Sequence, residues 1–223
     1  MGKINLAVCS CGRVASSRCP NKMVRAFGGT TLTDIFLQKL AKLGGNTFFA
    51  GFEDIFEEKC KANGVPFVKR TKESAFIDEP ASEIYSFLRE QPYEQFLMVN
   101  ACMPFLKVQS IIDFLNSCSD SKQAAFAVIK KSNYFVELDG TPINFSKDLS
   151  TINTKKISPL YEFAHAFYYF DKDYFVKNGR YWDWNEVRYV EIPSGLEVFD
   201  IDTEEDFKIA ESVYKMRKKE GLV

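Results

Sequence analysis

Three cations, a small hydroxyl and a proline follow the first apolar run of the chain. After Ile4–Val8 come, in order, Arg13, Ser16, Arg18, Pro20 and Lys22. A loop that leaves a buried strand can present backbone N–H groups and positive charge to an anion. A G-x-x-x-x-G-K-S/T phosphate loop is absent, so the spacing predicts a phosphate-binding loop of another kind, with a solvated surface turn as the alternative.

Two carboxylates lie near the other end of the chain, in Phe199-Asp200-Ile201-Asp202-Thr203. Alternation along an extended backbone puts Asp200 and Asp202 on one face, where they would repel each other by roughly 4 kcal/mol at 4 Å and an effective dielectric constant of 20. A shared divalent cation such as Mg²⁺ removes that repulsion. A helix cap is the alternative for this pair, and it is the role that we expect for Asp206.

These segments resemble the motifs of the acylneuraminate cytidylyltransferase family, which uses CTP to activate sugars. Gly12–Met23 is similar to the family pattern A-R-x-G-S-x-R-x-P-x-K-N, although Met23 replaces its final Asn. Phe199–Phe207 is similar to F-D-I-D-T-x-x-D-F, and Asn100–Phe105 stands where the family has L-Q-P-T-S-P-L. The resemblance spans nearly the whole chain. The motifs near the two ends match the family pattern well, and the motif in the middle matches it poorly.

The resemblance implies a role for each matching residue. Arg18 and Lys22 would hold the β- and γ-phosphates of CTP, Arg13 would meet charge at the α-phosphate, and Ser16 would complete the cradle. Arg13 and Lys22 are therefore the expected catalytic residues. Asp200 and Asp202 would hold Mg²⁺ as the cofactor.

The base and acceptor contacts depart further from the family. Arg70 resembles an arginine that contacts the base, with a solvated arginine as an equal alternative, and Ser82 is a candidate for the same pocket. Asn100 replaces the family's glutamine on the acceptor side, and Ala164–Tyr168 replaces its N-G-A-x-Y. We therefore expect the residues that bind the nucleotide donor to be retained and those that bind the acceptor to be altered.

Composition limits the kinds of partner. The chain has 223 residues, is 46% hydrophobic and carries a net charge of -1, so it can bury one sizeable core as a single domain, 1–223. A balanced charge argues against a nucleic-acid coat or a membrane-surface protein. No run approaches the roughly 20 apolar residues of a membrane span, and the start resembles no signal peptide, so we expect a cytoplasmic protein.

The cysteines and the single histidine offer little chemistry of their own. Six cysteines at these spacings fit neither a disulfide framework nor a common zinc module, so we expect free thiols. His165 lies among aromatic residues, so we expect it to pack in a strand rather than to act in catalysis.

Strands and amphipathic helices alternate as far as Ile129. We expect strands at Ile4–Val8, Thr47–Gly51, Val65–Val68, Phe96–Val99, Ala124–Ile129 and Phe163–Phe170, and helices from Leu32 to a stop at Gly44 and over Glu53–Asn63, Pro80–Gln91, Val108–Cys118 and Thr203–Lys218. This order predicts an α/β fold with a mainly parallel sheet and ligands at the carboxyl ends of its strands. The resemblance implies a three-layer α/β/α, Rossmann-like nucleotidyltransferase fold.

The alternation of strands and helices is interrupted at residues 131–160. Tyr134–Leu138, the turn Asp139-Gly140 and Thr141–Phe145 predict a protruding hairpin. An isolated two-stranded ribbon is marginal and needs a surface on which to pack. The resemblance implies that this insertion contacts a second copy of the chain in a homodimer.

The expected function is transfer of CMP from CTP to a small acceptor with release of pyrophosphate. A sugar acid of the nonulosonic type, for surface glycan biosynthesis, is the favoured acceptor. The altered Asn100 turn keeps a second acceptor class open, the phosphate or phosphonate of a small non-sugar molecule. A non-catalytic nucleotide-binding homologue is the alternative outside the enzyme class.

Overall fold

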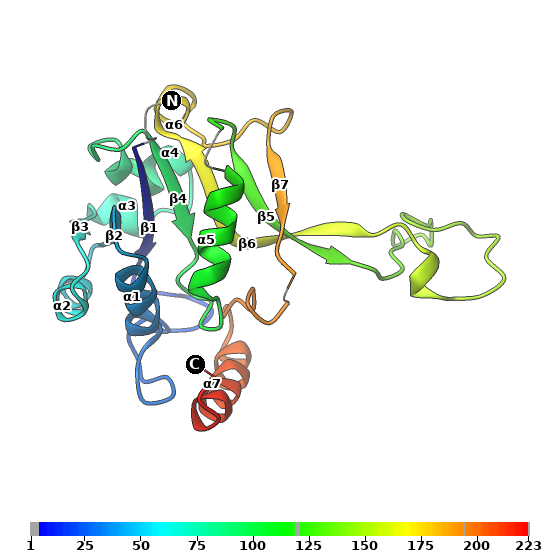
Figure 1. The fold of residues 1–223 in the computed structure, drawn as a ribbon, viewed down its shortest axis with the longest axis horizontal. Coiled ribbons are helices and arrows are strands. Elements are labelled where there is room, and N and C mark those ends of the chain that lie inside the picture. The colour runs from blue at the N-terminus through cyan, green and yellow to red at the C-terminus, as the bar shows by residue number, and fades with distance from the viewer. Residues whose placement is uncertain (1–4, 119–120, 194, 223) are drawn as a thin grey trace.

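The strands form one mixed, mainly parallel sheet. The computed structural model describes residues 5–118, 121–193 and 195–222. Within them, seven strands follow the order β3-β2-β1-β4-β6-β5-β7 (Figure 1). They are β1 (Leu6–Gly12), β2 (Thr47–Gly51), β3 (Phe67–Lys69), β4 (Gln95–Val99), β5 (Ala125–Lys131), β6 (Leu160–Asp171) and β7 (Arg188–Glu191). Only β6 runs antiparallel to its neighbours, β4 and β5.

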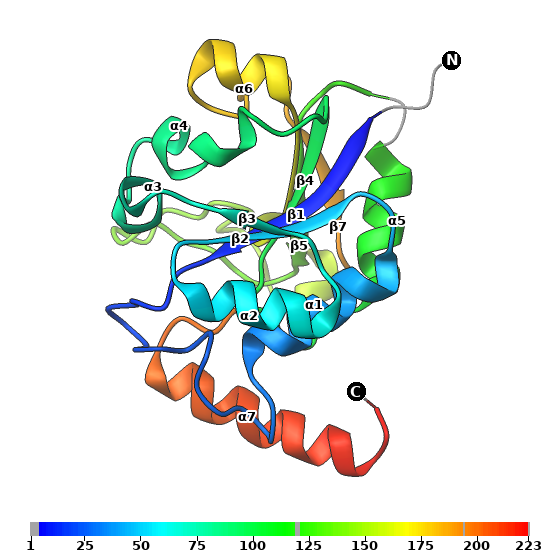
Figure 2. The same cartoon turned by 90° about the vertical axis from the view of Figure 1, so that its left-hand side faces the viewer.

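Helices cover both faces of the sheet (Figure 2). One face carries α1 (Leu32–Leu43), α2 (Asp54–Asn63) and α5 (Val108–Cys118), and the other carries α4 (Ala81–Ile84), the 3₁₀ turn Ser86–Leu88 and α6 (Lys172–Asn178). The short α3 (Lys72–Phe76) packs beside α4. The C-terminal α7 (Glu204–Lys219) extends the first of these helix layers. The expected three-layer α/β/α arrangement is confirmed.

Alternating side chains along the central strands feed two apolar clusters. On β1, Val8 belongs to the cluster under α1 and α5, whereas Ala7 and Cys9 belong to the cluster under α4 and α6. On β2, Phe49 belongs to the cluster under α1 and α5, and Phe48 belongs to the cluster under α4 and α6. Because successive strand residues point to opposite faces, a strand buried on both sides reads as a continuous apolar run.

Most of the expected elements are present. The structure confirms the strands at Thr47–Gly51 and Phe96–Val99 and the helices that begin at Leu32 and Val108. The expected first strand is longer than Ile4–Val8, since it continues to Gly12, and Ile4 itself lies outside the described residues. The segments α3, α6 and β7 were not expected. Their patterns are short, and a short run carries little periodicity.

The expected helix over Pro80–Gln91 is broken. It forms one turn, α4, and then a 3₁₀ turn after Tyr85. The carbonyl of Ile84 accepts hydrogen bonds from Arg70 Nη2 at 3.0 Å and from Ser74 Oγ at 2.6 Å. These tertiary contacts occupy the carbonyl that a continuing helix would use, so they override the apolar periodicity.

Residues 132–159 form an arm that projects from the ends of β5 and β6 (Figure 1). The turn at Asp139-Gly140 is present, with a Glu137 N–H to Thr141 O hydrogen bond of 2.8 Å, but the flanking pairing is a single bridge between Val136 and Pro142. The expected hairpin strands are therefore absent from the described arm. The Phe135 N–H, which would extend the ladder, donates instead to Asn144 Oδ1 at 3.0 Å.

Candidate active site

A cavity of about 410 Å³ opens at the carboxyl ends of β1 and β4. Its lining brings together segments that lie far apart in the sequence. The described residues around it are Ser10, Cys11, Arg18, Tyr85, Met98, Val99, Asn100, Ala101, Cys102, His165, Tyr168, Asp200 and Asp202. Ligands of open α/β sheets bind at this edge, so the cavity is the candidate active site.

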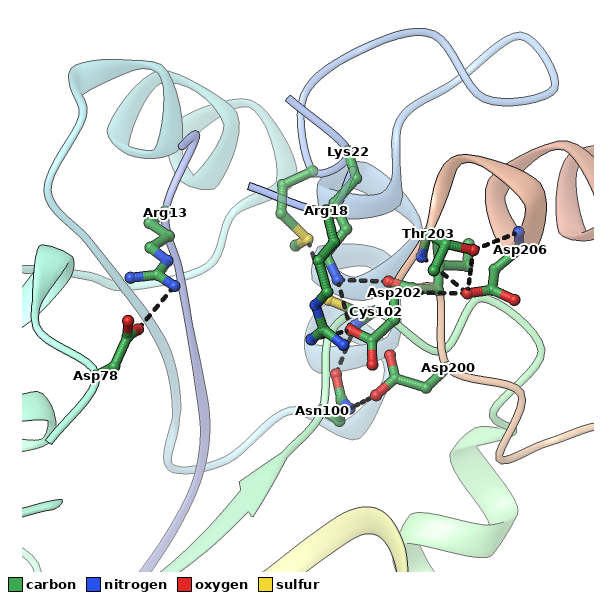
Figure 3. Close-up of polar contacts among 12 residues, drawn as sticks. Arg13, Arg18, Lys22, Asp78, Asn100, Cys102, Asp200, Asp202, Thr203 and Asp206 are labelled. Carbon is green, nitrogen blue, oxygen red and sulfur yellow. Dashed lines mark hydrogen bonds and ion pairs between the residues drawn. The ribbon is translucent and has the colours of Figure 1, made fainter. Parts of the chain in front are cut away.

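Two cations of the loop after β1 meet Asp202, as Figure 3 shows. Arg18 Nη2 lies 2.9 Å from Asp202 Oδ1, and Lys22 Nζ lies 3.4 Å from the same oxygen. Lys22 also donates a hydrogen bond to the carbonyl of Ile201. The side chain of Lys22 is 12% exposed and that of Arg18 is 66% exposed, so one cation is largely buried and the other reaches into solvent.

Asp200 lies beside this pair with one oxygen free of hydrogen bonds. Its Oδ2 accepts from Asn100 Nδ2 at 2.9 Å, and its Oδ1 is buried without a partner among the described residues. Burial, and after it the charge of Asp202, raise the pKa of Asp200 against the opposing effects of Lys22 and Asn100. An unpartnered carboxylate oxygen next to a second carboxylate is an arrangement that a divalent cation would satisfy.

Asp200 and Asp202 are held in place by a contact with the turn after β4 on one side and by the N-terminal cap of α7 on the other. Ile201 is fully buried, and its N–H donates to the carbonyl of Cys102 at 3.2 Å. Thr203 caps α7, and Asp206 Oδ2 accepts from the Thr203 N–H at 2.8 Å in a capping box. The cap that we expected for Asp206 is confirmed, and the geometry leaves Asp200 and Asp202 facing the cavity.

Lys22 remains positively charged in its partly buried position. Burial lowers its pKa, but the neighbouring side chains of Cys102, Asp200 and Asp202 outweigh burial, and the pKa lies above its usual value. Burial raises the pKa of Cys102 to about 12, so this residue is a neutral thiol near pH 7. The charge next to Lys22 therefore comes from the carboxylates.

Arg13 and Ser16 line a different cavity. Arg13 Nη2 lies 3.0 Å from Asp78 Oδ1, away from Arg18 and Lys22 (Figure 3). Both residues line a second depression, of about 390 Å³, with Pro20, Asn21 and Phe76 among its other walls. The structure thus divides the expected phosphate loop between two neighbouring depressions.

Arg70 and Ser82 also lie outside the main cavity. Arg70 is buried, and its guanidinium donates to Ser74 Oγ at 3.1 Å and to the carbonyl of Ile84, while its Cζ lies 5.5 Å from the Phe87 ring centroid. These contacts hold α3 against α4. Ser82 lies on α4, where its carbonyl accepts from Arg89 Nη2 at 3.1 Å. The structure does not bring Ser82 to Arg18 or Lys22.

Met23, which stands where the resembling family has Asn, belongs to the apolar core. Its side chain is buried, with Sδ 3.6 Å from Cys102 Sγ. The substitutions at positions 23 and 102 therefore form one contact beneath the cavity. All six cysteines are free thiols, as expected.

His165 and Tyr168 line the cavity, although the sequence reasoning placed only their segment on the acceptor side and named neither as a site residue. His165 is exposed at the cavity wall rather than packed, and its Nδ1 lies 2.6 Å from Tyr168 Oη. It has φ 52, and the pairing of β6 with β5 shifts register nearby. That backbone region favours glycine, which the resembling family has at this position, and a histidine in its place was the available signal.

Comparison with known proteins places the fold. No family model matches the chain, and no curated protein matches it in sequence. The structure of CMP:2-keto-3-deoxy-manno-octonic acid synthetase in complex with CTP superposes with a TM-score of 0.67 at 10% identity, over 95% of this chain and 99% of that one. A second structure, that of 4-diphosphocytidyl-2C-methyl-D-erythritol synthase from Anaerococcus prevotii DSM 20548, superposes with a TM-score of 0.64 at 14% identity. The superposition covers 95% of this chain and 99% of that one. The chain therefore has the α/β, Rossmann-like nucleotidyltransferase fold.

Proposed function

We propose that the chain is a cytidylyltransferase that transfers CMP from CTP to a small acceptor and releases pyrophosphate. The observation that carries the proposal is the convergence of Arg18 and Lys22 on Asp202, which lines the cavity together with Asp200 and Arg18. Phosphoryl and nucleotidyl transfers depend on positioning and on charge neutralisation rather than on covalent catalysis by the protein. The fold supports the assignment, because a neighbour with this architecture was solved with CTP.

The reaction needs no covalent enzyme intermediate. An acceptor oxygen attacks the α-phosphorus of CTP in line, the bond to the β-phosphate breaks, and its electron pair leaves with pyrophosphate. Lys22 and Arg18 would neutralise the β- and γ-phosphates, with Ser16 in the same loop. Arg13 would meet charge at the α-phosphate. Its partner Asp78 has a side chain that is 83% exposed, and an exposed ion pair holds an arginine only weakly.

Asp200, Asp202 and Asn100 are suited to holding Mg²⁺. The described residues contain no group of three or more His, Cys, Asp or Glu side chains that could form a protein-only metal site. Mg²⁺ commonly takes one or two carboxylates and completes its shell with water and substrate phosphates, so this pair fits the ion. When bound, Mg²⁺ supplies charge neutralisation for the phosphate oxygens.

The acceptor side is the part of the site whose motifs depart most from those of the resembling family. A sugar acid of the nonulosonic type remains the acceptor that the motifs imply. The second candidate is a phosphate or phosphonate on a small non-sugar molecule. The described lining of the cavity has Arg18 as its one permanent cation, and Arg18 is already paired with Asp202. This pairing leaves little positive charge for the anionic group of either acceptor, so the charge of the lining does not distinguish the two candidates.

A cytoplasmic homodimer is part of the proposal. Its support is the arm at 132–159, which projects from the sheet with large apolar side chains exposed, among them Leu138 and Ile152. No helix within the described part of the chain has the length and apolar character to cross a membrane. The alternative to turnover is a nucleotide-binding homologue without activity.

Pyrophosphate release separates the enzyme from the non-catalytic homologue. The protein is incubated with Mg²⁺, each nucleoside triphosphate and acceptors of both classes, and melting temperature is measured in parallel. We expect CTP to raise the melting temperature most, because a ligand that binds the folded state stabilises it, and to support release with one acceptor class. Equal shifts for all four nucleotides would contradict base selectivity. A CTP shift without release from any acceptor would favour the non-catalytic homologue.

Two carboxylate variants test the metal assignment. We expect Asp200→Asn and Asp202→Asn each to remove most pyrophosphate release through kcat, because an amide oxygen is a poorer ligand for a hard cation, while CTP still raises the melting temperature. Asp54→Asn is the control, since Asp54 is exposed on α2 and pairs with Lys69. If both site variants turn over normally at low Mg²⁺, Asp200 and Asp202 do not hold the metal and only lead into the N-terminus of α7.

A further inference from the structure

A small apolar pocket of about 170 Å³ adjoins the candidate active site. Aromatic rings make up nearly all of its walls, and they come from β5, β6 and the segment between α6 and β7. The lining residues are Phe126, Phe163, His165, Tyr168, Tyr181, Trp182 and Trp184. None of the reaction steps described above uses this pocket.

The rings form walls around a hollow rather than one flat platform. Phe126 meets Tyr168 at an interplanar angle of 80° and Trp184 at 86°. Trp182 and Trp184 meet at 59° with centroids 5.7 Å apart. A sugar ring stacks on a flat aromatic face, whereas walls at steep angles present several ring faces to one compact group.

The pocket is open to a ligand and continuous with the main cavity. Trp184 is 57% exposed, which leaves a large aromatic surface uncovered. His165 and Tyr168 line both the pocket and the main cavity. Burial, and after it the charge of Asp200, raise the pKa of Tyr168 to about 12, so the shared wall lies within electrostatic reach of Asp200. One molecule can therefore occupy both spaces.

Ring faces carry partial negative charge and attract cations. In the described part of the chain, the protein's own cations lie over other rings, those of Phe207, Phe52 and Phe87. The ring faces of the pocket are thus left for a cation of the ligand. Walls that are almost entirely apolar offer few acceptors for N–H groups, so a methylated ammonium loses less on entering than a primary one.

We propose that this pocket is an acceptor subsite for a quaternary ammonium group, and that the acceptor is a small phosphate or phosphonate that carries this group. The acceptor assignment rests on the proposed function. An oxygen of the acceptor's phosphate or phosphonate bonds to the α-phosphorus of CTP, the α–β bridging P–O bond breaks, and pyrophosphate leaves with its electron pair. The step requires no further reactant, and the ammonium end stays in the aromatic pocket.

Tryptophan fluorescence tests the subsite without any turnover. The chain has two tryptophans, Trp182 and Trp184, and both line the pocket, so intrinsic fluorescence reports on it directly. We expect titration with tetramethylammonium chloride to change this emission saturably, with sodium chloride as the ionic-strength control. Trp184→Leu should weaken the affinity by about 3- to 10-fold, the scale of one cation–π contact. The matched control is Tyr161→Leu, an exposed ring on the same β6 that lies outside the described lining.

A pair of isosteric acceptors tests the charge requirement. Phosphocholine is compared with 3,3-dimethylbutyl phosphate, in which carbon replaces the ammonium nitrogen, by pyrophosphate release with CTP and Mg²⁺. We expect a KM for phosphocholine at least about tenfold lower, and a rise in that KM in Trp184→Leu with kcat and the KM for CTP retained. Equal KM values for the two isosteres, or emission that tetramethylammonium leaves unchanged, would overturn the subsite. If tetramethylammonium quenches the emission saturably and Trp184→Leu weakens this quenching, the subsite is supported even when no acceptor releases pyrophosphate. The absence of pyrophosphate release would then overturn the proposed reaction alone.

Discussion

Lys22 and Arg18 contact the same carboxylate from different environments. Lys22 is largely buried and is held by the Ile201 carbonyl and by Asp202, whereas Arg18 reaches Asp202 from solvent. Charge interactions are stronger where solvent is excluded. The buried cation should therefore contribute more to binding a triphosphate than the exposed one, although the two lie four positions apart in one loop.

Alanine variants of the two cations measure this difference. We expect Arg18→Ala to weaken CTP binding by about 1.5 kcal/mol and Lys22→Ala by about 3 kcal/mol, within the range of hydrogen bonds to charged groups. Calorimetric titration gives the affinities, and Lys69→Ala is the control, because Lys69 is half-exposed and pairs with Asp54. Equal affinities for Lys22→Ala and wild type would show that the loop does not hold the triphosphate.

The spacing of these residues predicted part of the site and not the rest. The proximity of Lys22 to Asp200 and Asp202 was expected from the resemblance of both segments to motifs of one family, because no strand was expected directly before Asp200. The partners of Arg13 and Arg70 could not, because a sequence does not show where a long flexible side chain finds its acceptor. Asp78 and the Ile84 carbonyl decide those positions.

Helix α1 carries a lysine whose pKa couples stability to pH. Lys39 Nζ donates to the carbonyls of Met103 at 3.1 Å and Pro104 at 2.9 Å, in the turn that follows β4. Burial lowers the pKa of Lys39 to about 7, and Glu197 opposes this effect only in part. In the unfolded chain the pKa is about 10.4, so between pH 7 and pH 10 the unfolded state binds a proton that the folded state has released.

The free energy of unfolding should therefore rise with pH across this window, by at most about 1.4 kcal/mol per pH unit from Lys39. We expect Lys39→Met, which cannot titrate, to lack this contribution, so that its stability relative to wild type falls as pH rises from 7 to 10. Urea unfolding at three pH values measures the difference, and Lys61→Met on α2 is the control with an exposed lysine. A constant difference between Lys39→Met and wild type across the window would contradict the lowered pKa.

At the scale of elements, long periodic segments could be predicted and short ones could not. Helix α1 ends at Gly44, whose N–H donates to the Leu40 carbonyl, and the glycine pair marks this end in the sequence. The expected helix over Pro80–Gln91 has the right apolar spacing, but hydrogen bonds from Arg70 and Ser74 end it after one turn. Those contacts depend on side chains that precede the segment, so its own pattern does not contain them.

At the scale of the whole molecule, the alternation of strands and helices predicted the layers but not the strand order. The parallel strands β1, β2 and β4 follow from helical crossovers. The strand at Phe163–Phe170 reads as buried from its residues, yet its place between β4 and β5 and its antiparallel direction are set by pairing. An apolar run does not specify its neighbour.

The arm at 132–159 is the feature of the whole molecule that a single copy explains least. Its side chains contact water where a folded chain usually buries them, since Leu138 is 107% exposed and Ile152 is 88% exposed relative to a free residue. One bridge between Val136 and Pro142 is weak support for such a projection. A second copy of the chain would cover the apolar surface.

Charged substitutions on the arm test this association. We expect the wild type to be a dimer with a melting temperature that rises with protein concentration, and Leu138→Asp with Ile152→Asp to give a monomer without that dependence. Light scattering after size exclusion gives the mass. Val176→Asp on α6, where Val176 is 50% exposed, is the control and should remain a dimer. Both arm residues are already in water in the single chain, so the double variant should keep its fold, and a folded double variant that still dimerises would place the interface elsewhere.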